Sequence, residues 1–446
     1  MTDAAIIYSH SNTPRLNYIV DFLSRYYGLS FRLTSDEEKY INADVSCKIN
    51  YSYHQIISGE IWIHPHALLF ESAVHPVKVE CVEHNNYKVF FKTEGSVNFD
   101  LLAAIFYLIT RYEEYLPHKR DIYGRYAHEN SLAFREQFLR LPLVNIWLED
   151  FRKLLAEKNT VFITHYSQYI FLPTYDIDIA WSYRNKGFKR NAAAILKLFF
   201  TGQWRNLSQR IKVLRKKIQD PFNAYEWMAE LHHQQNLKPI YFFLVAQQKG
   251  KYDKNIDVEH KDFKQLVTAT ASKYKIALHP SWASGDVHAL LSKEKSWLEQ
   301  LVQQPIDASR QHYIRFYLPE TYRSLLATGI VNDYSMGYGS INGFRASIAS
   351  SFYWYDLKHE EQTQLLIHPF CFMDANAYYE QKLSAEEALQ ELMHYYQTIK
   401  TVNGKLITIW HNSFLGTDSE FEGWREVYQR FIETVAKNET STLSQK

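Results

Sequence analysis

The alternation of short apolar segments with helix-length stretches, from residue 170 onward, most constrains how this chain can fold. Strand-like apolar runs recur at residues 169–173, 239–246, 275–279, 313–316, 365–368 and 406–411. Strands that are apolar on both faces and separated by helices are typical of a parallel sheet covered on both sides. Six such strands within about 280 residues predict a (β/α) barrel, complete or partial.

The first 165 residues show a different, mixed α/β pattern. A buried strand is expected at 4–8, a helix through Leu16 to Leu23, and a hairpin formed by 77–82 and 87–92. An apolar helix is expected from 101 to 112, with Pro117 as its stop. We therefore expect an α/β fold of two parts, with their boundary near 158–168. These parts are a mixed α/β domain at 1–165 and a barrel at 166–436, followed by a flexible polar tail at 437–446.

Charge and cysteine content exclude several classes of protein. Lys and Arg total 50 against 49 Asp and Glu, so no basic surplus points to a nucleic-acid partner. No apolar run reaches the ~18 residues of a membrane span, and the first residues lack a signal-peptide pattern. The three cysteines are scattered, which fits a reducing compartment. We expect a cytoplasmic protein, with its oligomeric state left open.

Ionisable residues stand where several of the predicted strands end. Asp176 and Asp178 follow one strand, His279 ends another, and His411 ends the last. Catalytic groups of parallel barrels lie at the carboxyl ends of strands, so these four residues can converge. Imidazole and carboxylate groups are what a divalent cation and a general base require. The alternative is that each residue is only a helix cap or a turn former.

Several motifs resemble the polysaccharide deacetylase superfamily, carbohydrate esterase family four. The segments that carry the resemblance are T-Y-D-I-D at 174–178, P-I-Y-F-F-L at 239–244, L-H-P-S at 278–281 and I-W-H-N at 409–412. Further segments resemble a two-domain bacterial subfamily in which an uncharacterised N-terminal domain precedes the deacetylase-like domain. They include R-Y-E-E-Y-L at 111, D-I-Y-G-R-Y at 121, D-Y-S-M-G-Y at 333, G-F-R-A-S at 343 and H-P-F-C-F-M-D at 368.

The resemblance implies a distorted (β/α) barrel that binds a divalent cation, with zinc favoured, and hydrolyses an N- or O-acetyl group of a carbohydrate substrate. It implies that Asp176 is the general base, that Asp178 is a metal ligand, and that His411 is the general acid. The family has adjacent aspartates in this motif, whereas Ile177 intervenes here, so the two aspartate roles can be exchanged.

The second family motif is incomplete. It supplies two metal histidines four residues apart; His279 matches the first, but Ala283 takes the place of the second. We expect His312 to supply the third ligand, against the alternative of a packed core histidine. If no third ligand is present, the chain is a metal-free or inactive deacetylase-like protein that binds a carbohydrate or a protein partner.

Two arginines and three aromatic residues lie beside these motifs. Arg345 and Arg310 are candidates for orienting the base or binding substrate, with a structural ion pair as the alternative, preferred for Arg310. Trp282, Tyr338 and Trp410 are candidates for a sugar-binding platform, or for packing in the core.

Residues 184–219 contain many basic residues and no acidic one. Such a basic helical insertion can rest on an anionic membrane surface, steer an anionic glycan or a lipid-linked sugar toward the barrel, or be an ordinary helical pair with a solvated basic face. His232 and His233 are adjacent on a helix, and we expect a solvated surface pair. Arg111, Glu113 and Glu114 are expected to form a structural charged cluster at a helix end.

Overall fold

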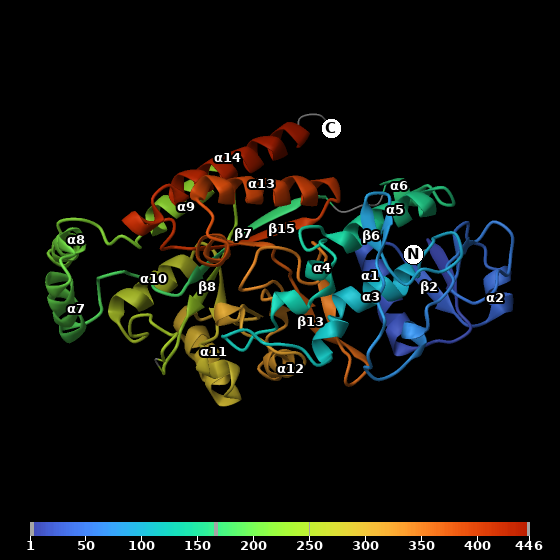
Figure 1. Ribbon diagram of the computed structural model, residues 1–446, viewed down its shortest axis with the longest axis horizontal. Helices are drawn as coiled ribbons and strands as arrows, with labels where there is room; N and C mark the ends of the chain where they lie inside the picture. Colours follow the sequence, from blue (N-terminus) through green and yellow to red (C-terminus); the bar gives the residue numbers. More distant parts are fainter. Residues whose placement is uncertain (1–3, 165–167, 249, 444–446) are drawn as a thin grey trace.

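The computed structural model describes residues 4–164, 168–248 and 250–443. In Figure 1 most of the N-terminal part, in blue to blue-green, lies at one end, its cyan segment around α4 reaches toward the middle, and the rest of the chain forms a larger body beside it. None of the described helices is both long and apolar enough to cross a bilayer. The predicted boundary falls partly on residues 165–167, which lie outside the described residues.

The C-terminal part is built on a nine-stranded sheet with the order β12-β13-β11-β10-β9-β8-β7-β15-β14. Eight of these strands run parallel, and only β12 is antiparallel to its neighbour. Their bounds are β7 (Ile170–Ile177), β8 (Ile240–Leu244), β9 (Lys275–His279), β10 (Ala308–Ser309), β11 (Asn332–Asp333), β12 (Phe352–Asp356), β13 (Glu361–Ile367), β14 (Phe372–Met373) and β15 (Lys405–His411).

The first and last long strands of this sheet are direct neighbours. β7 pairs with β15 over seven residues, and the register sets Asp176 opposite His411. Five of the six predicted strands are present, but the one at 313–316 is wrong. Residues His312–Ile314 form a short 3₁₀ turn, with Tyr313 at φ 59°, and the strand in this region is β10 instead. A left-handed backbone at Tyr313 is incompatible with a continuing strand.

Helices connect the strands and cover the sheet. They are α7 (Phe188–Phe200), α8 (Trp204–Leu214), α9 (Tyr225–Gln234), α10 (Lys261–Ala271), α11 (His288–Val302), α12 (Glu320–Ala327), α13 (Ala385–Thr401) and α14 (Trp424–Leu443). Every residue of β8 is buried, as expected of a strand covered on both faces. α14 continues through Leu443 into the segment expected to be a tail, and residues 444–446 lie outside the described residues.

The N-terminal part holds a four-stranded parallel sheet with the order β2-β1-β3-β4. The predicted hairpin is present in shortened form as β5 and β6. The apolar helix α3 ends at Ile109, earlier than predicted, because Arg111 adopts a left-handed conformation. The elements are β1 (Ala5–Tyr8), α1 (Pro14–Tyr27), β2 (Phe31–Thr34), α2 (Glu37–Ile41), β3 (Lys48–Asn50), β4 (Ile61–Trp62), β5 (Val82–His84), β6 (Tyr87–Val89), α3 (Leu101–Ile109), α4 (Leu132–Arg135), α5 (Leu143–Ala156) and α6 (Val161–Thr164).

Buried polar contacts join the two parts of the chain. Glu114 lies between two arginines, accepting hydrogen bonds from Arg111 Nε at 2.7 Å and from Arg345 Nε at 2.8 Å. All three residues are buried. Burial alone would raise the pKa of Glu114, but Arg345 and Arg111 lower it to about 2. The charged cluster expected at this helix end is therefore structural, and it extends across to Arg345.

The prediction of a solvated His232–His233 pair is half wrong. His232 is fully buried, whereas His233 is exposed. The Tyr175 hydroxyl lies 2.6 Å from His232 Nε2, and burial lowers the pKa of His232 to about 3. His232 is thus a neutral core residue, because α9 turns that side toward β7 and β8.

Glu114→Gln tests whether this junction holds the parts together. The change leaves two buried guanidinium groups short of a counter-charge, so we expect a loss of about 3–5 kcal/mol in the free energy of unfolding, measured by urea denaturation. Since the pKa of Glu114 is lowered from 4.5 to about 2 in the folded protein, this loss holds at neutral pH. It shrinks as the pH falls from about 4.5 toward 2.

The matched control is Glu320→Gln, which breaks the exposed pair with Lys358. It should cost less than about 1 kcal/mol. Equal losses in the two variants would contradict a special role for Glu114.

Candidate metal centre and active site

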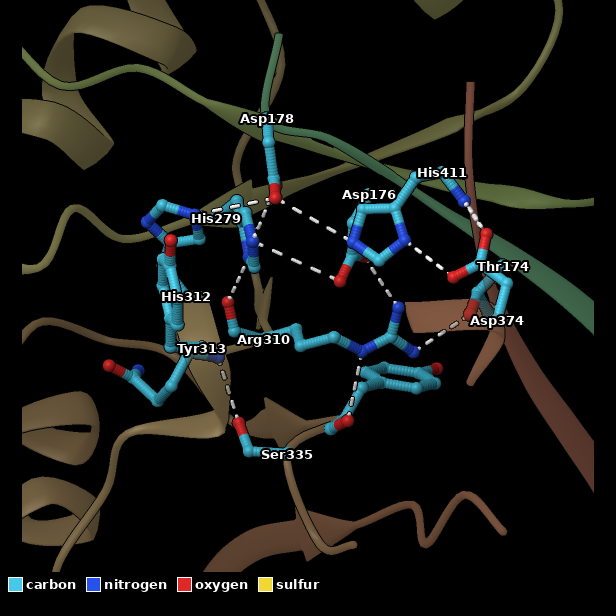
Figure 2. A network of polar contacts seen from close by, with 12 residues as sticks. Thr174, Asp176, Asp178, His279, Arg310, His312, Tyr313, Ser335, Asp374 and His411 are labelled. Atoms are coloured by element: carbon cyan, nitrogen blue, oxygen red, sulfur yellow. Dashed lines mark hydrogen bonds and ion pairs between the residues drawn. The ribbon is translucent and has the colours of Figure 1, made fainter. Parts of the chain in front are cut away.

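Ionisable side chains from separate strands meet at one end of the parallel sheet (Figure 2). Asp178 follows β7, His279 ends β9, and His312 lies in the turn after β10. Asp178 Oδ1 lies 3.1 Å from His279 Nε2, and Asp178 Oδ2 lies 3.4 Å from His312 Nε2. The three residues offer ligand atoms that all lie within 4.8 Å of one another. Residues that are 134 positions apart in the chain are thereby brought into a single group.

The hydrogen bond on the far side of His279 fixes its tautomer. His279 Nδ1 lies 2.6 Å from the backbone carbonyl oxygen of Arg310. A carbonyl oxygen only accepts, so Nδ1 must carry the proton. In the neutral imidazole, Nε2 then presents its lone pair toward Asp178. This is the arrangement that metal-binding histidines adopt.

His312 is held in the same manner by a buried carboxylate. Its Nδ1 donates to Asp253 Oδ1 at 3.0 Å, and the same oxygen accepts from the backbone N–H of Trp282. Burial lowers the pKa of His312, but Asp178 and Asp253 outweigh burial and raise it to about 9. The surroundings of Nε2 therefore favour a positive charge, whether a proton or a cation.

The donor atoms fit a divalent cation. Asp178 Oδ1 is buried and has no hydrogen-bond donor among the described residues, while it faces the lone pair of His279 Nε2. Two lone pairs at 3.1 Å repel each other unless a positive charge lies between them. One carboxylate and two imidazoles suit zinc and similar ions, whose ligand atoms sit about 3.3 Å apart when bonds are about 2.05 Å. Burial raises the pKa of Asp178, but the positive charge favoured on His312 and on His411 holds it well below its usual range.

Asp176 is fixed by a buried arginine. Arg310 Nη1 donates to Asp176 Oδ1 at 2.7 Å, and its other nitrogens donate to Thr174 Oγ1 and the Tyr334 carbonyl oxygen. The guanidinium lies 4.1 Å from the centre of the Phe242 ring. Asp176 Oδ2 remains directed toward His279 Nε2, at 3.9 Å. Arg310 therefore orients this carboxylate beside the candidate metal ligands Asp178, His279 and His312.

His411 is fixed by Asp374, which follows β14. His411 Nδ1 donates to Asp374 Oδ1 at 2.6 Å, and the backbone N–H of His411 donates to Oδ2. Its Nε2 lies 3.6 Å from Asp178 Oδ2. Burial lowers the pKa of His411, but Asp374 and the other carboxylates raise it to about 10. The side chain is thus held as a proton donor whose Nε2 faces the site.

A cavity of about 1250 Å³ opens over these residues, and the N-terminal part supplies one of its walls. Residues 119–123, 125 and 127–130 line it together with Asp176, Asp178, His279, His312 and His411. Arg125 Nη1 donates to the carbonyl oxygens of Tyr313 and Gly339, at 2.9 Å each. A Cβ at Gly339 would come within 2.1 Å of Arg125 Nη1, so only glycine leaves room for this contact. Both parts of the chain build the site.

Three predicted site residues lie elsewhere. Arg345 is buried against Glu114 and Gly337, so it is a junction residue and Arg310 takes the orienting role expected of it. Tyr338 and Trp410 are each 1 % exposed, which removes them from any sugar-binding surface. Their rings pack against Arg345 and Tyr428 respectively.

Trp282 is separated from the cavity by its neighbours. Its ring stacks on Tyr252 at 3.9 Å, with the Arg315 guanidinium 4.5 Å from its centre. Tyr123, Tyr252 and Tyr313 line the cavity, and the ring centres of Tyr123 and Tyr313 lie 5.3 Å apart. These tyrosines, which sequence reasoning missed, form one part of the aromatic lining of the cavity, and Phe222, Tyr379, Phe414 and Phe421 form another.

Sequence reasoning also missed Asp253 and Asp374. Asp374 ends the H-P-F-C-F-M-D segment, whose resemblance was noted without a role for the carboxylate. Its position directly after a short apolar run was a usable signal. Asp253 lies in a polar loop after β8 and carried no comparable signal.

The metal centre is tested by metal analysis of protein purified without chelator. We expect one equivalent of a divalent cation in the wild type and its loss in His279→Ala and Asp178→Ala, since each removes one of three ligands. Asp253→Asn should weaken affinity by about 10–100-fold, because it supports His312 from behind. His359→Ala, at an exposed histidine outside the group, is the control. Unchanged metal content in His279→Ala would contradict the assignment.

Comparisons with known proteins find one family model and several solved structures that are similar to the chain. Residues 5–160 match the model of a family of unknown function (DUF7033). No curated protein matches the chain. Among solved structures, the chain is similar to one described as a polysaccharide deacetylase from Mycobacterium smegmatis, with 12 % identity over 60 % of this chain and 84 % of that one, at a TM-score of 0.39. A second, described as a polysaccharide deacetylase from Pseudomonas aeruginosa PAO1, shares 9 % identity over 60 % and 85 % of the two chains, also at 0.39.

Proposed function

We propose that the protein is a metal-dependent hydrolase that removes N- or O-linked acetyl groups from a sugar or polysaccharide. The observation that carries this proposal is the arrangement around the metal-binding group. A carboxylate held by Arg310 and an imidazole held by Asp374 lie on adjacent strands beside Asp178, His279 and His312. A hydrolase of this kind needs a fixed base, a fixed acid and a cation between them.

The residues divide the proton transfers between them. Asp176 takes a proton from the attacking water as the water oxygen bonds to the acetyl carbonyl carbon. His411 gives its Nε2 proton to the nitrogen or oxygen of the sugar as the bond to that carbon breaks, so acetate and the free amine or alcohol are released. A divalent cation held by Asp178, His279 and His312 would supply Lewis-acid activation of the carbonyl and of the water.

The aspartate roles follow from their contacts. Both carboxylate oxygens of Asp178 lie near imidazole nitrogens, Oδ1 near His279 and Oδ2 near His312 and His411. One carboxylate oxygen of Asp176, in contrast, pairs with Arg310. A ligand needs oxygens free of strong donors, and a base needs a fixed orientation. We therefore assign Asp176 as base and Asp178 as ligand, rather than the exchanged roles.

The second candidate function is a deacetylase-like protein that binds a carbohydrate without hydrolysing it. Ala283, where the family motif has a histidine, favours it. His312 weighs against it, because its Nε2 reaches Asp178 from another loop and completes a three-residue group.

Replacement of the base and the acid separates these candidates. His411→Ala and Asp176→Asn should each lower turnover by roughly 10²–10⁴-fold, since each removes one positioned proton-transfer group. Both variants should keep their metal. The assay is acetate release from acetylated glucosamine oligomers and acetylated xylan fragments, with His233→Ala as an exposed-histidine control.

A wild type that binds metal and releases no acetate from either substrate would favour the binding protein. Full activity in His411→Ala would contradict the assignment of the acid.

Tyr123→Ala tests whether the N-terminal wall contacts the substrate. Loss of this ring should raise KM by about ten-fold with little change in kcat, because binding that is equal in ground and transition states affects KM alone. Tyr53→Ala, an exposed tyrosine of the same part that does not line the cavity, is the control. An unchanged KM in Tyr123→Ala would show that the wall does not touch substrate.

A further inference from the structure

The helices α7 and α8 form a hairpin that projects from the body at the end opposite the N-terminal part (Figure 1). Residues 184–219, which contain this hairpin, hold eleven of the chain's 50 basic residues and none of its 49 acidic ones. The remaining chain therefore has 39 basic and 49 acidic residues. A nearly neutral protein thus carries a strongly basic hairpin on an acidic body.

The same hairpin exposes large apolar side chains. Phe188 is 87 % exposed and Phe200 is 81 % exposed, and Leu196, Phe199 and Trp204 are also exposed. At about 100° per residue, the four side chains on α7 fall within an arc of about 120°. The Phe199 ring lies 5.2 Å from the Trp204 ring, which carries this surface onto the start of α8. We call these five residues the apolar patch.

Basic side chains border the apolar patch. On α7, Lys189 lies about 20° inside one edge of the same arc and Lys197 about 60° beyond that edge, and Arg205 follows Trp204. An apolar strip bordered by lysine and arginine is the composition of helices that lie in the headgroup region of a bilayer. A solvated basic helix alone would have no reason to expose two phenylalanines almost completely.

The hairpin is closed at its base and joined there to α10, where Asp262 Oδ2 accepts hydrogen bonds from Arg184 Nη2 at 3.2 Å and from Asn185 Nδ2 at 3.0 Å. Asp220 accepts hydrogen bonds from the backbone N–H groups of Ser182, Tyr183 and Arg184, at 2.7–3.0 Å. Arg210 Nη1 donates to Asn191 Oδ1 at 2.8 Å and joins the two helices. The apolar patch is therefore presented in a defined orientation.

We propose that the hairpin docks the protein on an anionic lipid surface. The apolar patch enters the headgroup boundary, and the basic residues pair with lipid phosphates. Nucleic acid would match the charge, and unpaired bases stack on aromatic rings, but Leu196 and the continuous apolar face shared by α7 and α8 match a lipid boundary better. A second copy of the hairpin would match the apolar patch but would bring eleven like charges against eleven.

Docking also orients the catalytic cavity. The hairpin connects β7 to α9, so it leaves the sheet at the end that carries Asp176, and Ile179 and Phe222 at its base line the cavity. The cavity then lies near the lipid surface, where a glycan attached to a lipid is presented. This last step rests on the proposed function, whereas lipid binding does not.

The test is co-sedimentation of the full chain with vesicles of phosphatidylcholine, with and without about 30 % phosphatidylglycerol. We expect binding to the anionic vesicles and its loss at roughly 0.5 M salt. Two variants should each lower partitioning by at least about ten-fold: Phe188→Ser with Phe200→Ser, and Lys189→Glu with Lys197→Glu and Arg205→Glu.

Matched controls change similar side chains elsewhere. Lys39→Glu with Lys78→Glu and Lys358→Glu reverses three exposed charges outside the hairpin, and Ile122→Ser removes an apolar side chain that is 90 % exposed. Both controls should bind vesicles as the wild type does. Unchanged circular dichroism and metal content show that the hairpin variants are folded.

Four outcomes would overturn the proposal. The first is that the wild type does not bind anionic vesicles, and the second is that it binds them no better than both hairpin variants do. The third is that the protein captures labelled RNA or DNA and not vesicles. The fourth is that the wild type forms a dimer without binding vesicles, and that Phe188→Ser with Phe200→Ser makes this dimer dissociate.

Discussion

The parallel pairing of β7 with β15 is the constraint on which the site depends. Seven residue pairs fix the register of these strands, and the last pair sets Asp176 beside His411. Asp178 follows one residue beyond β7 and therefore reaches the same end of the sheet. A slip of one residue in this register would turn one of the two side chains away from the cavity, because successive strand residues face opposite sides.

Each polar group of the site is fixed by a partner behind it. The Arg310 carbonyl oxygen orients His279, Asp253 orients His312, Asp374 orients His411, and the Arg310 guanidinium orients Asp176. Arg310 thus serves two site residues, one through its backbone and one through its side chain. Burying these charged groups is costly, and mutual pairing offsets that cost. This explains why so many ionisable side chains lie together at the end of one sheet.

Strands that are apolar throughout could be predicted from the sequence, and so could the residues at their ends. The structure has β9 at the predicted 275–279, and it brings together Asp178, His279 and His312 as expected. The arginines show the limit of such reasoning. Arg310 pairs with Asp176, 134 positions away, and Arg345 pairs with Glu114, 231 positions away, so no local pattern distinguishes the two.

The errors in predicting local structure also arose because contacts between distant residues leave no local pattern. The segment 313–316 has strand-like composition, but the chain turns at Tyr313 to direct His312 toward Asp178. Trp410 lies next to His411 in a strand, so the two side chains face opposite sides, and Trp410 packs in the core. The N-terminal wall of the cavity was not predicted, because contacts between distant parts of a chain leave no periodic signal.

We propose above that Asp178, His279 and His312 hold one divalent cation between the base and the acid. Anomalous diffraction from crystals of the full chain, recorded on both sides of the zinc absorption edge after zinc addition, tests it most directly. We expect a single strong peak bonded to an Asp178 carboxylate oxygen, His279 Nε2 and His312 Nε2, with His411 Nε2 unbonded. A peak ligated by His411, or no peak among these three side chains, would contradict it.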